Sequence, residues 1–152
     1  MGIEILQELL TGLGNASGIE GLQADDSGFC LIEVDGIVCN MQYVYDTNSL
    51  YVFAELGEIP AHLLGKLAPE LLSANLFGIK TGGGTLSLLE ESNQLVFSHQ
   101  TTLENIDAPR FEQILENCIN YMVHWKEALG KMIKSKTESE TFDAHLYTHI
   151  RG

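Results

Sequence analysis

The chain has three cysteines and five histidines, residue types that can act as nucleophiles or metal ligands. Cys30 and Cys39 fall on two strands predicted below to pair, on one face but on a diagonal. Diagonal neighbours lie ~7–8 Å apart at Cα, too far for a relaxed disulfide. A nucleophilic cysteine also needs a base and an orienting group. No feature of the sequence brings His99 or His124 to Cys118. We therefore interpret all three cysteines as reduced thiols within the core.

Two further patterns invite a ligand. His145 and His149 stand four residues apart and could chelate a metal on a helix, but their polar C-terminal setting favours a solvated surface. The triple glycine 82–84 could be interpreted as a phosphate-binding loop. Such a loop needs a strand before it, a helix after it and a Lys-Ser or Lys-Thr ending. Here the predicted order is helix then strand, and Leu86 follows. We predict no catalytic residue, no metal, no cofactor and no enzymatic activity.

The charge of the chain is strongly acidic and uneven. Its 152 residues carry a formal net charge of −13, with 21 acidic and 8 basic residues. Residues 1–125 hold 17 acids against Lys66, Lys80 and Arg110. This balance excludes phosphate-driven binding to nucleic acid or anionic lipid. No apolar run approaches the ~20 residues that span a bilayer. Glu4 and Glu8 stand where a signal peptide would be basic, and the odd cysteine count fits a reducing compartment, so we expect a cytoplasmic protein.

The elements that must position these residues follow from periodicity. Apolar residues at steps of 3 and 4 predict a helix over residues 3–13, stopped by Gly12 and Gly14, and a long helix over 108–133, capped by Asp107. Alternation and turn residues predict five strands. Their ranges are 29–34, 37–45, 50–55, 85–90 and 94–100. A turn at 61–67 and a helix begun by Pro69 lie between them. The fold class is α+β, an antiparallel sheet with helices packed on it, in the order α-β-β-β-α-β-β-α.

The first hairpin has a predictable register. Asp35-Gly36 is a strong two-residue turn, so Val34 should pair with Ile37 and the strands should follow from there. One face is then wholly apolar. The opposite face is mixed and lacks an obvious cover, and an exposed apolar patch usually marks an interaction site. Its apolar members are Phe29, Leu31, Val38 and Val44.

The helix from Pro69 to residue 77 is apolar on more than one face. Leu71, Leu72, Leu76 and Phe77 surround it, and such a short helix must be buried on two sides. A subunit interface and an internal core helix both satisfy this pattern. From Ser135 onward the chain is polar. We therefore divide it into a domain over residues 1–134 and a flexible tail over 135–152.

The run PELLSANLFGIKTGGGTLSLL, residues 69–89, resembles the signature of type III secretion chaperones of the Tir-chaperone (CesT-like) family. The resemblance spans roughly residues 3–130 and includes the Trp-Lys-Glu-Ala-Leu ending at 125–129. It implies a cytoplasmic bacterial homodimer, without enzymatic activity, that captures an extended N-terminal segment of an effector and keeps it secretion-competent. The secretion ATPase is a further partner that it allows.

Carried onto this chain, the resemblance assigns two surfaces. The dimer candidates are Leu71, Leu72, Leu76 and Phe77, and the effector-binding candidates are Ile5, Leu9, Phe29, Leu31, Val38 and Val44. A small-molecule-binding or regulatory α+β domain using the same sheet face is the alternative interpretation of these features.

Overall fold

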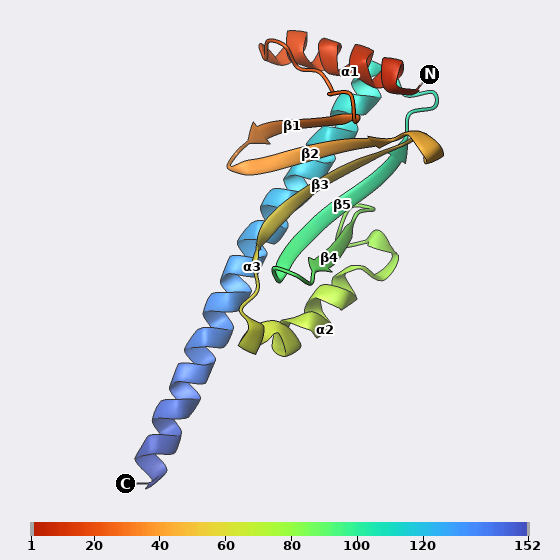
Figure 1. Ribbon diagram of the computed structural model, residues 1–152. Helices are drawn as coiled ribbons and strands as arrows, with labels where there is room; N and C mark the ends of the chain where they lie inside the picture. The colour runs from red at the N-terminus through yellow and green to blue at the C-terminus, as the bar shows by residue number, and fades with distance from the viewer. Residues whose placement is uncertain (1, 152) are drawn as a thin grey trace.

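The computed structural model describes the backbone of residues 2–151 and the side chains of residues 2–141. Its element order is the predicted one, with three short 3-10 turns added (Figure 1). The helices are α1 (Gly2–Ser17), α2 (Leu64–Ala74) and α3 (Ala108–Arg151). The strands are β1 (Phe29–Val34), β2 (Ile37–Val44), β3 (Ser49–Glu58), β4 (Thr85–Leu89) and β5 (Gln94–Thr102). The 3-10 turns are η1 (Tyr45–Thr47), η2 (Ala61–Leu63) and η3 (Leu76–Gly78).

The five strands form one antiparallel sheet in the order β1-β2-β3-β5-β4. Val34 pairs with Ile37, Ile32 with Cys39 and Cys30 with Met41, as the two-residue turn predicts. Because side chains alternate along a strand, these residues all point to one face. That face is the buried one: Cys39 and Met41 are fully covered.

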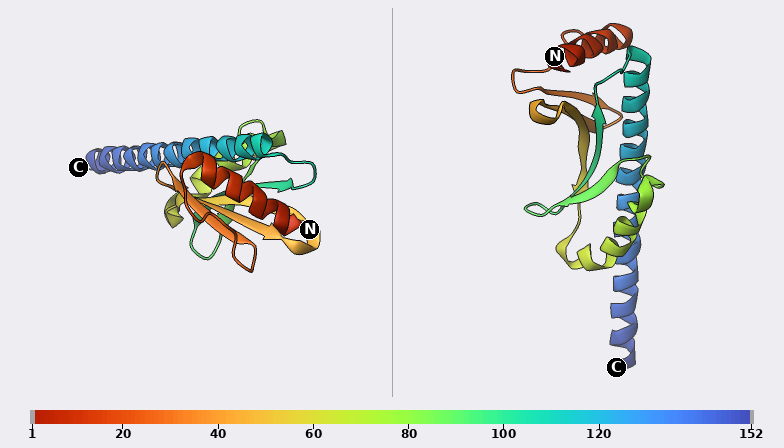
Figure 2. Two further views of the ribbon diagram at one scale, coloured as in Figure 1. Left: turned by 90° about the horizontal axis from the view of Figure 1, so that it is seen from above. Right: turned by 90° about the vertical axis from the view of Figure 1, so that its right-hand side faces the viewer.

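The helices lie on one side of the sheet. α3 packs across β3, β2 and β5, α1 packs against α3 at the β1 end, and α2 packs near β4. Figure 2 shows the opposite face of the sheet without a covering helix among the described residues. The domain therefore has a single core, between the sheet and α3, and leaves one sheet face to solvent.

The first helix runs further than its glycines predicted. α1 continues through Gly12 and Gly14 and ends at Ser17, before Gly18 with φ +71°. A Cβ on Gly14 would lie 2.7 Å from the backbone oxygen of Ile19. Glycine is present there because the chain passes close by, so it does not act as a helix stop.

The second helix also differs from its prediction. It begins at Leu64, so Pro69 lies inside it, and it ends at Ala74 instead of residue 77. A proline within a helix leaves the carbonyl four residues earlier without its bond. That carbonyl belongs to Gly65, which is exposed, so water can take the place of the lost donor. Burial of Leu67 and Leu71 holds the helix together across the proline.

The last helix is the largest departure. Asp107 caps it as predicted, with the Arg110 N–H donating to Asp107 Oδ1 at 2.9 Å. The helix then continues through residues 135–151, and the whole of α3 is ~66 Å long at 1.5 Å per residue. Lys66 Nζ donates to Glu140 Oε1, and His62 Nε2 lies 3.6 Å from Glu140 Oε2, so α3 stays tied to α2 and η2 beyond the sheet. The flexibility of this segment and the boundary at residue 134 stay predictions.

Candidate functional site

The uncovered face of the sheet carries a band of apolar side chains. Leu31 pairs with Asn40, and Asn40 pairs with Phe53, so these side chains form one row across three strands. Val38 lies on the same face. Leu31 is 50% exposed and Val38 is 46% exposed. We call the face formed by Phe29, Leu31, Val38, Asn40, Val44 and Phe53 the open face.

The outer edge of β1 is free along part of its length. At its start, the Asp25 N–H donates to the Phe29 carbonyl at 2.8 Å, and Asp25 Oδ1 accepts from the Phe29 N–H at 2.9 Å. The backbone groups of Leu31 and Glu33 point the same way as those of Phe29 because the pattern alternates every second residue. Among described residues, their only outward partner is the Cys30 thiol, 4.0 Å from the Leu31 oxygen. This edge can pair with another extended chain.

The connection from α1 to β1 is held by one side-chain amide. Gln7 Nε2 donates to the Ala24 carbonyl at 2.8 Å, and the Ala24 N–H donates to Gln7 Oε1 at 3.0 Å. Asp25 closes the last turn, and a hydrogen bond from the Ser27 hydroxyl lowers the pKa of its carboxyl below the ordinary value. The connection is thereby fixed beside the β1 edge.

A second apolar surface lies over α2, η3 and β4. Five large side chains there are at least 39% exposed. We call it the α2–β4 patch: Leu72, Leu76, Phe77, Ile79 and Leu88. It borders an apolar groove of about 300 Å³ between α2 and β4, lined among others by Leu64, Ala68 and Leu95. Several exposed large apolar side chains beside such a groove, on an otherwise acidic chain, mark a site of association.

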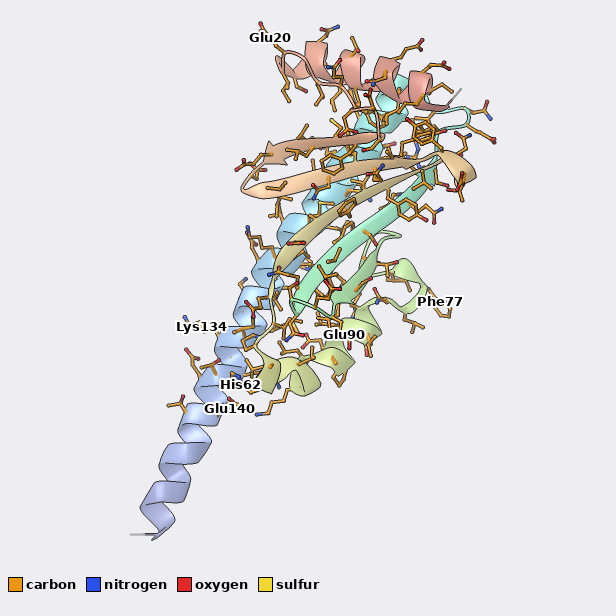
Figure 3. All side chains as sticks on the ribbon, in the orientation of Figure 1. Glu20, His62, Phe77, Glu90, Lys134 and Glu140 are labelled. Carbon is orange, nitrogen blue, oxygen red and sulfur yellow. The ribbon has the colours of Figure 1, made fainter. Side chains whose placement is uncertain are left out.

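Phe77 is the most unusual residue of this patch. It is 87% exposed and has φ +55°, a left-handed conformation that is an outlier for a bulky residue (Figure 3). Its position is fixed by Asn75, whose Nδ2 donates to the Leu86 carbonyl at 2.8 Å and whose Oδ1 accepts from the Leu86 N–H at 2.7 Å. The side chain of Asn75 thus pairs with the edge of β4 as a peptide group would.

The triple glycine connects η3 to β4 and packs against α3. A Cβ on Gly82 would lie 2.2 Å from the Tyr121 ring, and a Cβ on Gly84 would lie 2.3 Å from the Phe97 ring. The Trp125 indole N–H donates to the Lys80 carbonyl at 3.0 Å. Gly82 and Gly84 thus admit the loop close to two aromatic rings.

Among the described residues, the cysteines and histidines are not assembled into a site. The three cysteines are free and buried, and burial raises the pKa of Cys39 and of Cys118 to about 12 and raises that of Cys30. Within the described residues no cluster of three His, Cys, Asp or Glu side chains could hold a metal ion. His145 and His149 have side chains outside the described residues. No described helix is long and apolar enough to cross a membrane.

The candidate contact residues divide by exposure. Leu31, Val38, Leu72, Leu76 and Phe77 are exposed, as is Ile5 at 37%. Phe29 and Val44 are partly buried. Leu9 and Leu71 are each 7% exposed and belong to the core, so neither offers a free surface in the single chain. Both face inward because the helical period places them beside Leu6 and Leu67.

Other surface residues were missed by the sequence reasoning. Ile79 and Leu88 extend the α2–β4 patch, Leu89 is exposed on the opposite face of β4, and the partly buried Phe53 completes the open face. Strand alternation signalled Leu89 and Phe53, whereas nothing in the local pattern singled out Ile79.

The sequence profile of the Tir chaperone protein (CesT) family matches residues 8–126. This chain belongs to that family. A protein of Chlamydia pneumoniae, CPj0713/CpB0740, is 28% identical over 131 residues, covering 83% of this chain and 97% of that protein.

Solved structures share the fold at low identity. A chain of the ExsC–ExsE complex superposes with a TM-score of 0.68 at 15% identity, covering 84% of this chain and 95% of that one. A chain of the HopA1–SchA chaperone–effector complex gives 0.65 at 19% identity, covering 81% and 94%. YbjN of E. coli, described as a putative transcription regulator, gives 0.55 at 13% identity, covering 91% and 94%. At these identities the likeness establishes the fold alone.

Proposed function

We propose that this protein is a cytoplasmic type III secretion chaperone that binds an extended N-terminal segment of one or more effectors. Membership of the CesT family supports the class of function. The observation that carries the proposal is the open face, where Leu31 and Val38 remain half exposed beside the free edge of β1. An extended segment can lay alternate side chains on such a face and bond to the edge. It would thereby stay soluble on an acidic carrier.

The carrier acts as a homodimer through the α2–β4 patch. The patch supplies Leu72, Leu76 and Phe77, three large apolar side chains that are each more than 60% exposed in the single chain. A two-fold interface presents the same patch twice, so one apolar surface covers its copy. The groove beside α2 gives the partner's side chains a place to enter. The protein works by binding and catalyses no reaction.

Binding can be tested by one charge on the open face. Val38→Glu adds a carboxylate to a side chain that is 46% exposed, so the fold should survive. The variant should lose at least tenfold in affinity for a co-purified effector fragment in calorimetry, because the apolar contact worth ~1.5–3 kcal/mol is lost. Val38→Thr keeps the branched shape without the charge and is the control.

The outcomes separate the candidate functions. If Val38→Glu binds the effector as tightly as the wild type, the open face is not the binding surface. The alternative is a small-molecule-binding or regulatory domain that uses the same sheet face, and YbjN, described as a putative transcription regulator, shares the fold. That alternative predicts that the purified protein releases a small molecule when it is denatured. It also predicts that the protein retains no effector fragment.

A further inference from the structure

A groove of about 390 Å³ lies on the inner side of β1, where the end of α1 meets the first turns of α3. Its floor is apolar. It is formed by Leu13, Ile19, Ile32, Val34, Leu115 and Ile119. Ile19 is 40% exposed and also lines the hollow between the α1–β1 connection and β1. The groove therefore opens beside the free edge of β1.

The rim of this groove is acidic. Asp35, Glu112 and Glu116 line it, and all three are exposed. Glu112 and Glu116 are one helical turn apart, so their carboxylates lie on the same side of α3. None of the three forms a salt bridge with a described basic side chain. Lys126 reaches this end of the sheet, but its ammonium group donates to the Gly36 carbonyl at 3.0 Å.

The β1 edge adds a further carboxylate and a row of backbone groups. Glu33 is exposed on the open face next to Leu31, and its backbone N–H and carbonyl point outward with those of Leu31. A chain lying along this edge would therefore meet carboxylates on both sides of the sheet. It would also meet an apolar floor on the α3 side.

We propose that this groove selects a basic extended segment, with an apolar side chain seated on the floor and Lys or Arg residues on either side of it. The inference rests on the proposed function and names the chemistry of the segment. Charge complementarity carries it, because three carboxylates without basic partners line the rim of an apolar depression, and a fourth, that of Glu33, lies across the β1 edge on the open face. A second copy of this chain is a poor occupant: its residues 1–125 would bring 17 acids and three basic residues.

The test uses matched variants and matched peptides. A fluorescein-labelled ten-residue peptide that alternates Leu with Lys is titrated with the homodimer by anisotropy, beside a version with Gln in place of Lys. Glu112→Gln/Glu116→Gln removes two carboxylates from the rim. Glu90→Gln/Glu91→Gln removes two exposed carboxylates from the β4–β5 turn and is the control for net charge.

We expect the rim variant to bind the lysine peptide at least tenfold more weakly, with a smaller loss of affinity on adding salt. The control variant should change the affinity less than twofold. Equal losses in both variants, or equal binding of the lysine and glutamine peptides, would overturn the inference. Failure of the lysine peptide to bind the wild type would overturn it as well. Failure of the proposed function is read separately, from the Val38→Glu assay with the effector fragment.

Discussion

Phe77→Asn should separate the stability of the single chain from the stability of the proposed dimer. The ring of Phe77 is 87% exposed, so its removal takes almost nothing from the core. The left-handed backbone costs an ordinary L-residue ~1–2 kcal/mol, and asparagine tolerates it better. The free energy of unfolding of the monomer should therefore stay unchanged or rise by ~1 kcal/mol.

The dimer should respond in the opposite direction. Burying one phenylalanine contributes ~1.5–3 kcal/mol, and a two-fold interface contains two of them, which gives ~3–6 kcal/mol. At 1.4 kcal/mol per tenfold, the dissociation constant of the dimer should rise ~10²–10⁴-fold. Sedimentation velocity over a dilution series measures this constant, and urea unfolding at the lowest concentration measures the monomer. Leu31→Asn, on the open face, is the control.

Two results would refute the reasoning on Phe77. An unchanged dissociation constant would show that the ring lies outside the interface. A monomer destabilised by several kcal/mol would show that the exposed conformation is not the one in solution.

Three further outcomes can be measured by urea unfolding. Asn75→Ala should lower the free energy of unfolding by ~2–4 kcal/mol, because it leaves the N–H and the carbonyl of the buried Leu86 without partners, at ~1–3 kcal/mol for each group. A loss below ~0.5 kcal/mol would contradict the pairing. Gly82→Ala should cost ~1–3 kcal/mol, more than Gly83→Ala, whose added methyl has its nearest neighbour 3.9 Å away; equal costs would argue against the ring contact. The Cys118 thiol has a pKa of about 12 when folded against 9.0 for the free group, so the unfolded state loses its proton first as the pH rises. Stability should fall by ~1.4 kcal/mol per pH unit above pH 9 for this group, and Cys118→Ala should flatten the profile; parallel profiles would refute the shift.

The sequence predicted the structure best where the local backbone geometry allows only one arrangement. The two-residue turn at Asp35-Gly36 determined the hairpin register and hence which face is buried. The start of α2 was wrong because the penalty of Pro69 was outweighed by burial of Leu67, a tertiary effect. The helix beyond residue 134 was missed because a polar segment gives no apolar period to follow.

The candidate sites were partly predictable for the same reason. The apolar members of the open face followed from the alternation of side chains along the strands. The apolar residues at the end of the predicted helix indicated a second surface, and Leu76 and Phe77 are exposed there in the single chain. The acidic groove was invisible in the sequence. Asp35 and Glu112 are 77 positions apart and meet only because α3 returns to the β1 end of the sheet.

The bond between Gln7 and Ala24 has a consequence for how this fold diversifies. Gln7 bonds only to the backbone N–H and carbonyl of Ala24 and makes no hydrogen bond to a side chain of the connection. The exposed side chains of Ile19, Glu20 and Gln23, which line the hollow beside β1, can therefore be exchanged without loosening the loop that carries them, whereas Gly21 (φ +69°) and Leu22, which packs on the core, are constrained. The side chain of Gln7 holds the loop in place, whereas other side chains line the hollow. Descendants of one ancestral carrier can thus acquire new cargo by changing a few loop residues.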